Sequence, residues 1–295
     1  MQSISILSFH LGLQGSYANI LDLNHYLQKD YEVNFYTTDI KDLYNVTRGS
    51  KRLHTFNELR NINHYKTIEE DIVITDFKSL IKLFENNIKV VCKKFIVMDN
   101  NELSYHLNKV KHAKFFHHNL DINRLIKPHQ YKDILFLFPP SNVEQFTKQY
   151  PDIPFRVFFK KIHWDLLKRV PTDNFNALFY RFDDIDILKE IEHKYGDQLV
   201  TFDEYKELNL WDYKGMIYYR RKHLEYYEQL GRLIFEFIML GKEVHFLKDP
   251  FEVADGLSDY LRHYDIQFDE NFKVITKAEE LIYLMTIDYR EKPWE

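Results

Sequence analysis

Short apolar runs alternate with longer amphipathic segments through the first half of the chain. The runs have the length of β-strands and lie at 3–9, 33–38, 71–76, 93–99, 133–138 and 155–159. The segments between them, such as 16–29, carry apolar residues at helical spacing. Strands that alternate with helices of this length predict βαβ units and a parallel sheet with helices on both faces.

A second series of the same kind follows a connector. Its predicted strands are 176–182, 198–202, 215–221, 243–247 and 272–276, and its predicted helices are 185–196, 224–240 and 251–264. We therefore expect an α/β fold with two Rossmann-like domains in series, over 1–160 and 176–276, with a linker at 161–175 and a C-terminal helix at 277–295. Ligands of such sheets bind beyond the carboxyl ends of the strands, so the cleft between the domains is the expected site.

Composition narrows the class of protein. With 45% hydrophobic residues the 295-residue chain can bury a core, which excludes a mainly disordered protein. No apolar run approaches the ~20 residues that span a bilayer, and the one cysteine, Cys92, excludes an internal disulfide framework. The 24 Phe and 21 Tyr against 8 Gly and 8 Pro indicate an AT-rich genome, such as many phages or low-GC bacteria have. We expect a cytoplasmic protein, in the host cytoplasm if it is phage-encoded.

Charge is distributed unevenly along the chain. Residues 1–172 carry a net charge of +6 and residues 173–295 a net charge of −11, and the basic excess concentrates in 89–132. One interpretation is a solvated mixed surface; the other is a docking face for a polyanion such as DNA, because positive potential attracts phosphates. The second interpretation makes six basic residues candidates for DNA binding: Lys93, Lys94, Lys109, Lys111, Lys114 and Arg124.

Two glycines three residues apart, Gly12 and Gly15, follow the first predicted strand. Glycines at this position let a backbone approach a ligand closely at a helix N-terminus, which makes them candidate donor-binding residues. The spacing is not that of the dinucleotide fingerprint. An ordinary tight turn explains it equally well.

Three charged residues, Glu228, Arg232 and Glu236, are spaced by four on the predicted helix 224–240. Steps of four on one helix keep them within about 80° of a single stripe. The plain explanation is an amphipathic helix with an i,i+4 salt bridge. However, Glu236 interrupts the apolar run LIFEFIML, and a carboxylate buried there needs a partner.

This segment resembles the donor-binding motif E-x7-E of GT-B glycosyltransferases, with Gly241 and Val244 in register and the family's small residues and proline replaced. The resemblance implies that the second domain binds a nucleotide sugar. We expect no tightly bound cofactor and no metal ligands, because no DxD-like motif is placed where it would serve; metal dependence stays open. It implies that Glu236 bonds the ribose hydroxyls and that Glu228 lies nearest the transferred sugar. Arg232 and Arg181 are the matching candidates for neutralising the diphosphate, which needs fixed cations as it departs. The family's C-terminal helix commonly crosses back to the first domain.

A polar stretch, Asp99-Asn100-Asn101-Glu102, follows the strand predicted at 93–99. A carboxylate at this end of a strand can accept a proton from an acceptor hydroxyl, or it can cap a helix. The position of Asp99 is similar to that of the catalytic aspartate in phage DNA glucosyltransferases. That similarity implies transfer of glucose from UDP-glucose to a hydroxymethylated base in DNA. A polysaccharide, lipid or small-molecule acceptor, or a non-enzymatic scaffold or inhibitor, stays open, as do the stereochemical outcome and the oligomeric state.

Overall fold

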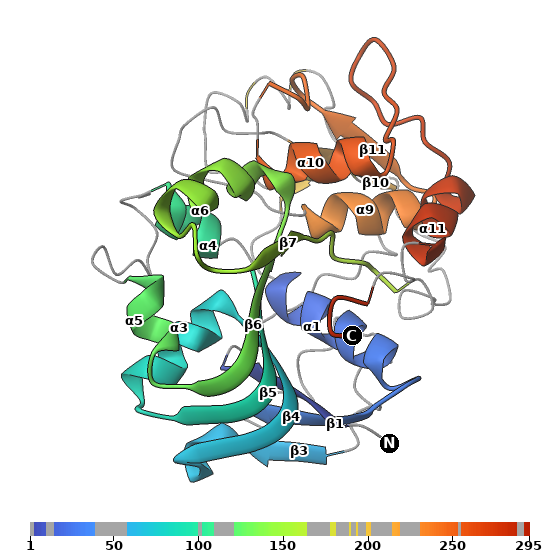
Figure 1. Cartoon of the computed structure of the whole chain (residues 1–295). Helices are drawn as coiled ribbons and strands as arrows, with labels where there is room; N and C mark the ends of the chain where they lie inside the picture. The colour runs from blue at the N-terminus through green and yellow to red at the C-terminus, as the bar shows by residue number, and fades with distance from the viewer. Residues whose placement is uncertain are drawn as a thin grey trace.

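The computed structural model describes most of the first half of the chain and separate parts of the second. The described residues are 3–9, 15–38, 58–99, 102–108, 121–163, 178–180, 189, 193, 199–201, 214–218, 231–252, 255–287 and 292–295. Two parallel sheets organise them, one in each half of the sequence. This arrangement confirms the expected α/β fold with two Rossmann-like domains (Figure 1).

The first domain is built on a seven-stranded parallel sheet of order β3-β2-β1-β4-β5-β6-β7. The strands are β1 (Ser3–Ser8), β2 (Glu32–Thr37), β3 (Glu58–Asn61), β4 (Thr67–Asp76), β5 (Lys89–Met98), β6 (Gln130–Phe138) and β7 (Phe155–Val157). All six strands that the apolar runs predict in this half are present. The sequence does not predict β3, because its four residues, ELRN, contain no apolar run.

Helices cover both faces of this sheet. They are α1 (Gly15–Leu27), α3 (Phe77–Glu85), α4 (Glu102–Leu107), α5 (Ile122–Ile126) and α6 (Val143–Gln149), with 3₁₀ turns η2 (Ile62–His64) and η3 (Pro140–Asn142). The helix α1 packs on one face through Ile20, Leu23 and Leu27. The helices α3 to α6 pack on the other face, over a core that also holds Cys92. The sheet is therefore buried on both sides, which explains its continuous apolar strands.

The second domain is built on a four-stranded parallel sheet of order β11-β10-β8-β9. Its elements are β8 (Leu178–Tyr180), β9 (Leu199–Thr201), β10 (Gly215–Tyr218), α9 (Arg232–Met239), β11 (Glu243–Phe246), α10 (Gly256–His263) and α11 (Ala278–Ile287). A separate core lies under α9, α10 and α11 and includes Phe235, Phe237, Tyr260 and Leu281.

Two predictions for this domain are wrong in part. The helix expected over 224–240 begins only at Arg232, because Gly231 has φ 54 in the left-handed region, where a right-handed helix cannot continue. The rest of the predicted helix, 224–230 with Glu228, lies outside the described residues. The strand expected at 272–276 forms only isolated antiparallel bridges from Lys273 and Val274, and it does not join the parallel sheet.

The chain passes from one domain to the other between β7 and residue 163. Phe158 belongs to the core under α1, whereas Ile162 belongs to the core of the second domain. Hydroxyls of α10 and the residue after it hold this connector: the Lys160 backbone N–H donates to the Tyr260 hydroxyl at 2.5 Å, and Tyr264 donates to the Lys160 carbonyl at 3.5 Å. The connector is thus bonded to the second domain before the chain enters it.

The end of the chain returns to the first domain, but the residues that cross back are not the predicted C-terminal helix. The helix α11 stays on the second domain, where Leu281 and Met285 pack in its core. The residues that cross back are 292–295: Trp294 is buried in the core under α1, and Lys292 forms an ion pair with Asp30 at 3.0 Å. Figure 1 shows this C-terminal segment beside α1. Within the described residues, no helix is long and apolar enough to cross a membrane.

Candidate functional site

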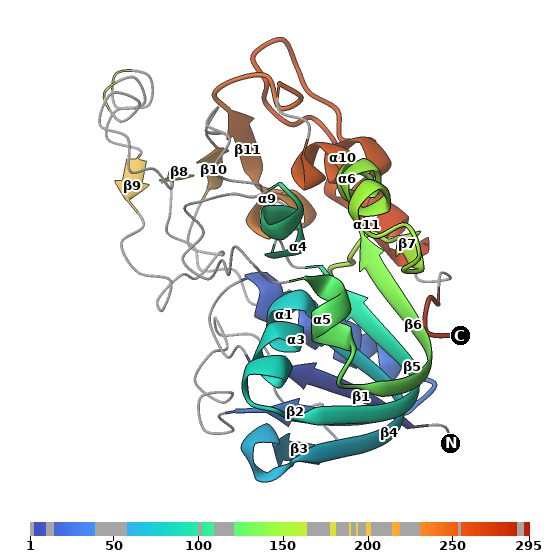
Figure 2. The same cartoon turned by 60° about the vertical axis from the view of Figure 1, so that its left-hand side comes forward.

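Each of the two sheets has a point at which its strand order reverses. The order of the first sheet reverses between β1 and β4, and that of the second between β8 and β10. In open α/β sheets, ligands bind at such switch points, beyond the carboxyl ends of the strands. The helix α9 lies between the parallel strands β10 and β11 in sequence, so its N-terminus is at the carboxyl edge of its sheet. Both views place α9 above α1 at the domain boundary (Figures 1 and 2).

Arg232, the first residue of α9, joins the two domains at this boundary. Its Nε donates to Glu236 Oε1 at 2.6 Å, one helical turn away. Its Nη1 donates to Asn19 Oδ1 at 2.8 Å, and its Nη2 lies 2.5 Å from Asp22 Oδ2. Asn19 and Asp22 belong to α1 of the first domain. All three nitrogens of the guanidinium are therefore engaged, two of them by the other domain.

This ion-pair cluster is buried. Arg232 is 5% exposed, Asp22 2% and Glu236 1%. Burial lowers the pKa of the Arg232 guanidinium, but Asp22 and Glu236 more than offset it, so its pKa is raised overall. One cation faces two carboxylates, so the cluster carries a net negative charge when all three are ionised. Arg232 is therefore the partner that the position of Glu236 in an apolar run predicts.

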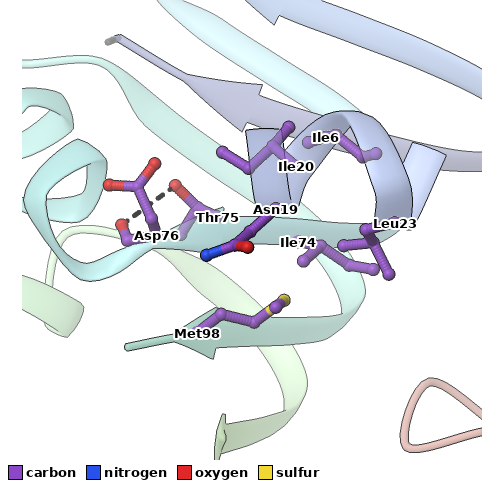
Figure 3. Close-up of a pocket in the computed structure, with 8 residues that line it drawn as sticks. All are labelled: Ile6, Asn19, Ile20, Leu23, Ile74, Thr75, Asp76 and Met98. Carbon is purple, nitrogen blue, oxygen red and sulfur yellow. Dashed lines mark hydrogen bonds between the residues drawn. The ribbon is translucent and has the colours of Figure 1, made fainter. Parts of the chain in front are cut away.

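A small cavity lies beside this cluster, between α1 and the carboxyl half of the first sheet. Its volume is about 10 Å³, and it is lined by Ile6, Asn19, Ile20, Leu23, Ile74, Thr75, Asp76 and Met98. Such a volume holds about one water molecule. The side chains of Asn19, Thr75 and Asp76 lie together there, and the rest of the lining is apolar (Figure 3). Because Asn19 also binds Arg232, the cavity and the ion-pair cluster share a wall.

Asp76 ends β4 at the switch point of the first sheet and is 5% exposed. Ser79 donates to both of its oxygens, from its backbone N–H and its hydroxyl, each at 2.8 Å. Ser8, at the end of β1, donates to Asp76 Oδ2 at 3.3 Å. Burial nonetheless raises the pKa of Asp76 above its ordinary value. This carboxylate links the ends of β1 and β4 and caps α3.

Further ionisable groups interact electrostatically with Asp76. Burial, together with the charges of Asp76 and Asp99, raises the pKa of Glu102 to about 8. Burial lowers the pKa of Lys160, in the connector, to about 8, although Asp99, Glu102 and Asp76 act in the opposite direction. Arg232 also lowers the pKa of Lys160. Lys160 therefore lies within electrostatic reach both of Arg232 and of the three acids at the carboxyl edge of the first sheet.

Asp99 is placed as a helix cap. It is fully buried, and its Oδ1 accepts from the Leu103 N–H at 3.0 Å. Its Oδ2 accepts from the Ser104 hydroxyl at 3.0 Å and from Asn142 Nδ2 at 2.9 Å. The capping interpretation of the sequence is therefore present in the structure. The role of Asp99 as a base stays a prediction.

The remaining predicted donor-site residues are only partly described. Gly15 is the first residue of α1. Gly12, Arg181 and Glu228 lie outside the described residues. Of the predicted residues, the structure therefore brings Arg232 and Glu236 together, and their contacts to α1 place them at the boundary between the two domains.

Three of the six basic candidates are described. Lys93 forms an ion pair with Asp71 at 2.7 Å, and the Arg124 guanidinium lies 5.5 Å from the centre of the Phe84 ring. Burial and the charge of Arg156 lower the pKa of Lys94. Lys109, Lys111 and Lys114 lie outside the described residues. DNA binding by this stretch stays a prediction.

Sequence reasoning did not single out Asn19, Asp22, Asp76 or Lys160. A signal existed for two of them: Asn19 and Asp22 interrupt the apolar positions of α1, three residues apart, and lie on one face of that helix. No cluster of three or more His, Cys, Asp or Glu side chains that could hold a metal ion occurs among the residues that the structure describes.

The two parallel sheets, one in each half of the chain, give two Rossmann-like domains in series. No family model matches the sequence, and no curated protein matches it. Among solved structures, the chain is similar to sucrose-phosphate synthase from Thermosynechococcus elongatus. The TM-score is 0.42 at 11% sequence identity, over 98% of this chain and 94% of that one.

Proposed function

We propose that this chain is a glycosyltransferase that takes a sugar from a nucleotide-sugar donor bound at the boundary between the two domains. One observation carries the proposal: the buried Arg232–Glu236 pair at the start of α9 lies at the boundary between the domains. A guanidinium binds phosphate oxygens in pairs, and a carboxylate accepts hydrogen bonds from hydroxyls. Together these two groups match the diphosphate and the ribose of a nucleotide sugar.

The proposed reaction breaks the bond between the anomeric carbon and the diphosphate oxygen and forms a bond from that carbon to an acceptor oxygen. The acceptor hydroxyl loses its proton, and the nucleoside diphosphate leaves with the negative charge. Arg232 would stabilise that charge, since a fixed cation in a buried site needs no reorganisation. Glu236 would orient the nucleotide through its ribose. Arg181 and Glu228 are proposed for the diphosphate and the sugar.

For the acceptor we propose a hydroxymethylated base in DNA, with UDP-glucose as the donor. The +6 net charge of residues 1–172 supports a polyanionic acceptor. Asp99 is the proposed base, and its position after β5 puts it at the carboxyl edge of the first sheet. To act, Asp99 would accept a hydrogen bond from the acceptor hydroxyl beside the bonds of the cap or in place of one of them.

Titration calorimetry with UDP and UDP-glucose tests the donor site. We expect binding by the wild-type protein and at least tenfold weaker binding by Glu236→Ala, because the carboxylate bonds the ribose. Glu279→Ala, which removes an exposed carboxylate from α11, is the matched control and should bind like the wild type. Absence of binding by the wild-type protein would contradict the proposed function.

Mass spectrometry after incubation with UDP-glucose and hydroxymethylcytosine-containing duplex tests the acceptor. We expect an added hexose, abolished by Asp99→Asn while donor binding persists. Donor hydrolysis without DNA glucosylation would point to another acceptor, such as a polysaccharide, lipid or small molecule. Donor binding with neither transfer nor hydrolysis would favour a non-enzymatic protein of this shape. Retained transfer by Asp99→Asn would restrict Asp99 to its capping role.

A further inference from the structure

All the hydrogen-bonding nitrogens of Arg232 are engaged in the described structure, and Asp22 contributes the charged contact from the first domain. Asn19 contributes a neutral amide oxygen, and Glu236 comes from the helix of Arg232 itself. Asp22 Oδ2 is 2.5 Å from Arg232 Nη2. The guanidinium has five N–H groups, and these contacts engage all three of its nitrogens. A phosphate that binds through a pair of oxygens needs two neighbouring N–H groups and therefore competes with these partners.

We propose that Asp22 occupies the place of the donor's diphosphate on Arg232, so that donor binding must displace this carboxylate. The inference rests on the proposed function, because it concerns the same site. A carboxylate and a phosphate present similar oxygen pairs to a guanidinium. Asp22 is held on a helix of the first domain, whereas Arg232 starts a helix of the second. Displacement of Asp22 therefore removes a charged contact between the domains.

The energetics make Asp22 a determinant of donor affinity. Asp22 and Arg232 are both at most 5% exposed, so solvent screens their ion pair little. Only molecules in which Asp22 has moved off Arg232 can bind the donor, and we call this arrangement receptive. The apparent affinity for the donor is the intrinsic affinity multiplied by the fraction of molecules in the receptive arrangement. Removing the charge of Asp22 while keeping its shape should raise the receptive fraction.

Calorimetry of Asp22→Asn with UDP tests this proposal. We expect the dissociation constant to fall by about tenfold relative to the wild type, if the receptive arrangement is roughly a tenth of the wild-type population. Asp30→Asn is the matched control: Asp30 follows the same helix and pairs with Lys292 at 3.0 Å, away from Arg232. It should bind UDP like the wild type.

Hydrogen exchange of the wild-type protein provides a test that needs no variant to fold. On addition of UDP, amides of α1 should exchange faster, since α1 loses its contact with Arg232. Equal or weaker UDP binding by Asp22→Asn, or unchanged or slowed exchange in α1 when UDP is bound, would overturn the inference while leaving the proposed function intact. Absence of UDP binding by the wild type, Asp22→Asn and Asp30→Asn alike would overturn both.

Discussion

Substituting Arg232 with methionine tests how much the two domains depend on the buried ion-pair cluster. Methionine keeps much of the side chain's length and removes its charge. Asp22 and Glu236 then remain at 2% and 1% exposure without the cation between them. Breaking a buried ion pair by removing one partner costs about 3–5 kcal/mol, because a charge stays behind uncompensated. The Asn19 hydrogen bond, also lost, adds roughly 1 kcal/mol.

Thermal unfolding at neutral pH measures this effect. A change of 1 kcal/mol shifts the midpoint by roughly 2–4 °C in a domain of 150–250 residues, so we expect Arg232→Met to unfold on the order of 10 °C earlier. Lowering the pH should narrow the difference, because protonating the two stranded carboxylates removes their charge. Arg124→Met, at an exposed position over Phe84, is the control and should shift the midpoint by less than about 2 °C.

A triple variant distinguishes two causes of the lost stability, the uncompensated buried charges and the lost side-chain packing. Adding Asp22→Asn and Glu236→Gln to Arg232→Met leaves a neutral cluster of nearly the same shape, and an unpaired buried amide costs less than an uncompensated buried charge. We expect the triple variant to recover part of the loss. A midpoint for Arg232→Met within 2 °C of the wild type, or no recovery in the triple variant, would refute the reasoning.

Three further predictions concern stability. Burial and two neighbouring carboxylates raise the pKa of Glu102 to about 8, so the folded state binds more protons than the unfolded state between about pH 4.5 and 8. The stability that protonated Glu102 contributes is therefore lost as the pH rises through that window. Glutamine does not titrate, so the melting temperature of Glu102→Gln should fall less than that of the wild type between about pH 4.5 and 8. Gly231→Ala should cost more stability than Gly241→Ala in urea unfolding: both glycines have positive φ, but an added Cβ meets side-chain carbons at 2.8 Å at Gly231 and nothing within 4 Å at Gly241; equal costs would contradict the packing argument. Trp294→Ala should lower the free energy of unfolding by about 3–5 kcal/mol, because Trp294 is 3% exposed, whereas Tyr283→Ala, at 65% exposure, should change it little.

The pattern of apolar residues predicts most of the fold, because strands that are buried on both faces consist of consecutive apolar residues. The six strands predicted for the first domain are present for this reason. An edge strand such as β3, with sequence ELRN, buries too little to leave that signal. The helix expected over 224–240 fails at Gly231 because periodicity reports which residues are apolar and cannot report a backbone φ of 54.

Part of the candidate site could be predicted in the same way. Glu236 interrupts an apolar run, and its requirement for a partner is met by Arg232, one turn earlier. The partners on α1 could not be predicted, since Asp22 is 210 positions away and only the packing of the two domains brings it to Arg232. Asp99 shows the opposite case: the sequence left a base and a cap open, and the structure displays the hydrogen bonds of the cap.

A crystal structure of the protein with UDP tests the central claim most directly. The account predicts the nucleotide at the carboxyl edge of β8 and β10, with its diphosphate on Arg232, its ribose within hydrogen-bonding distance of Glu236, and Asp22 moved off the guanidinium. A nucleotide bound elsewhere, or one bound while the Arg232–Asp22 ion pair stays intact, would contradict it.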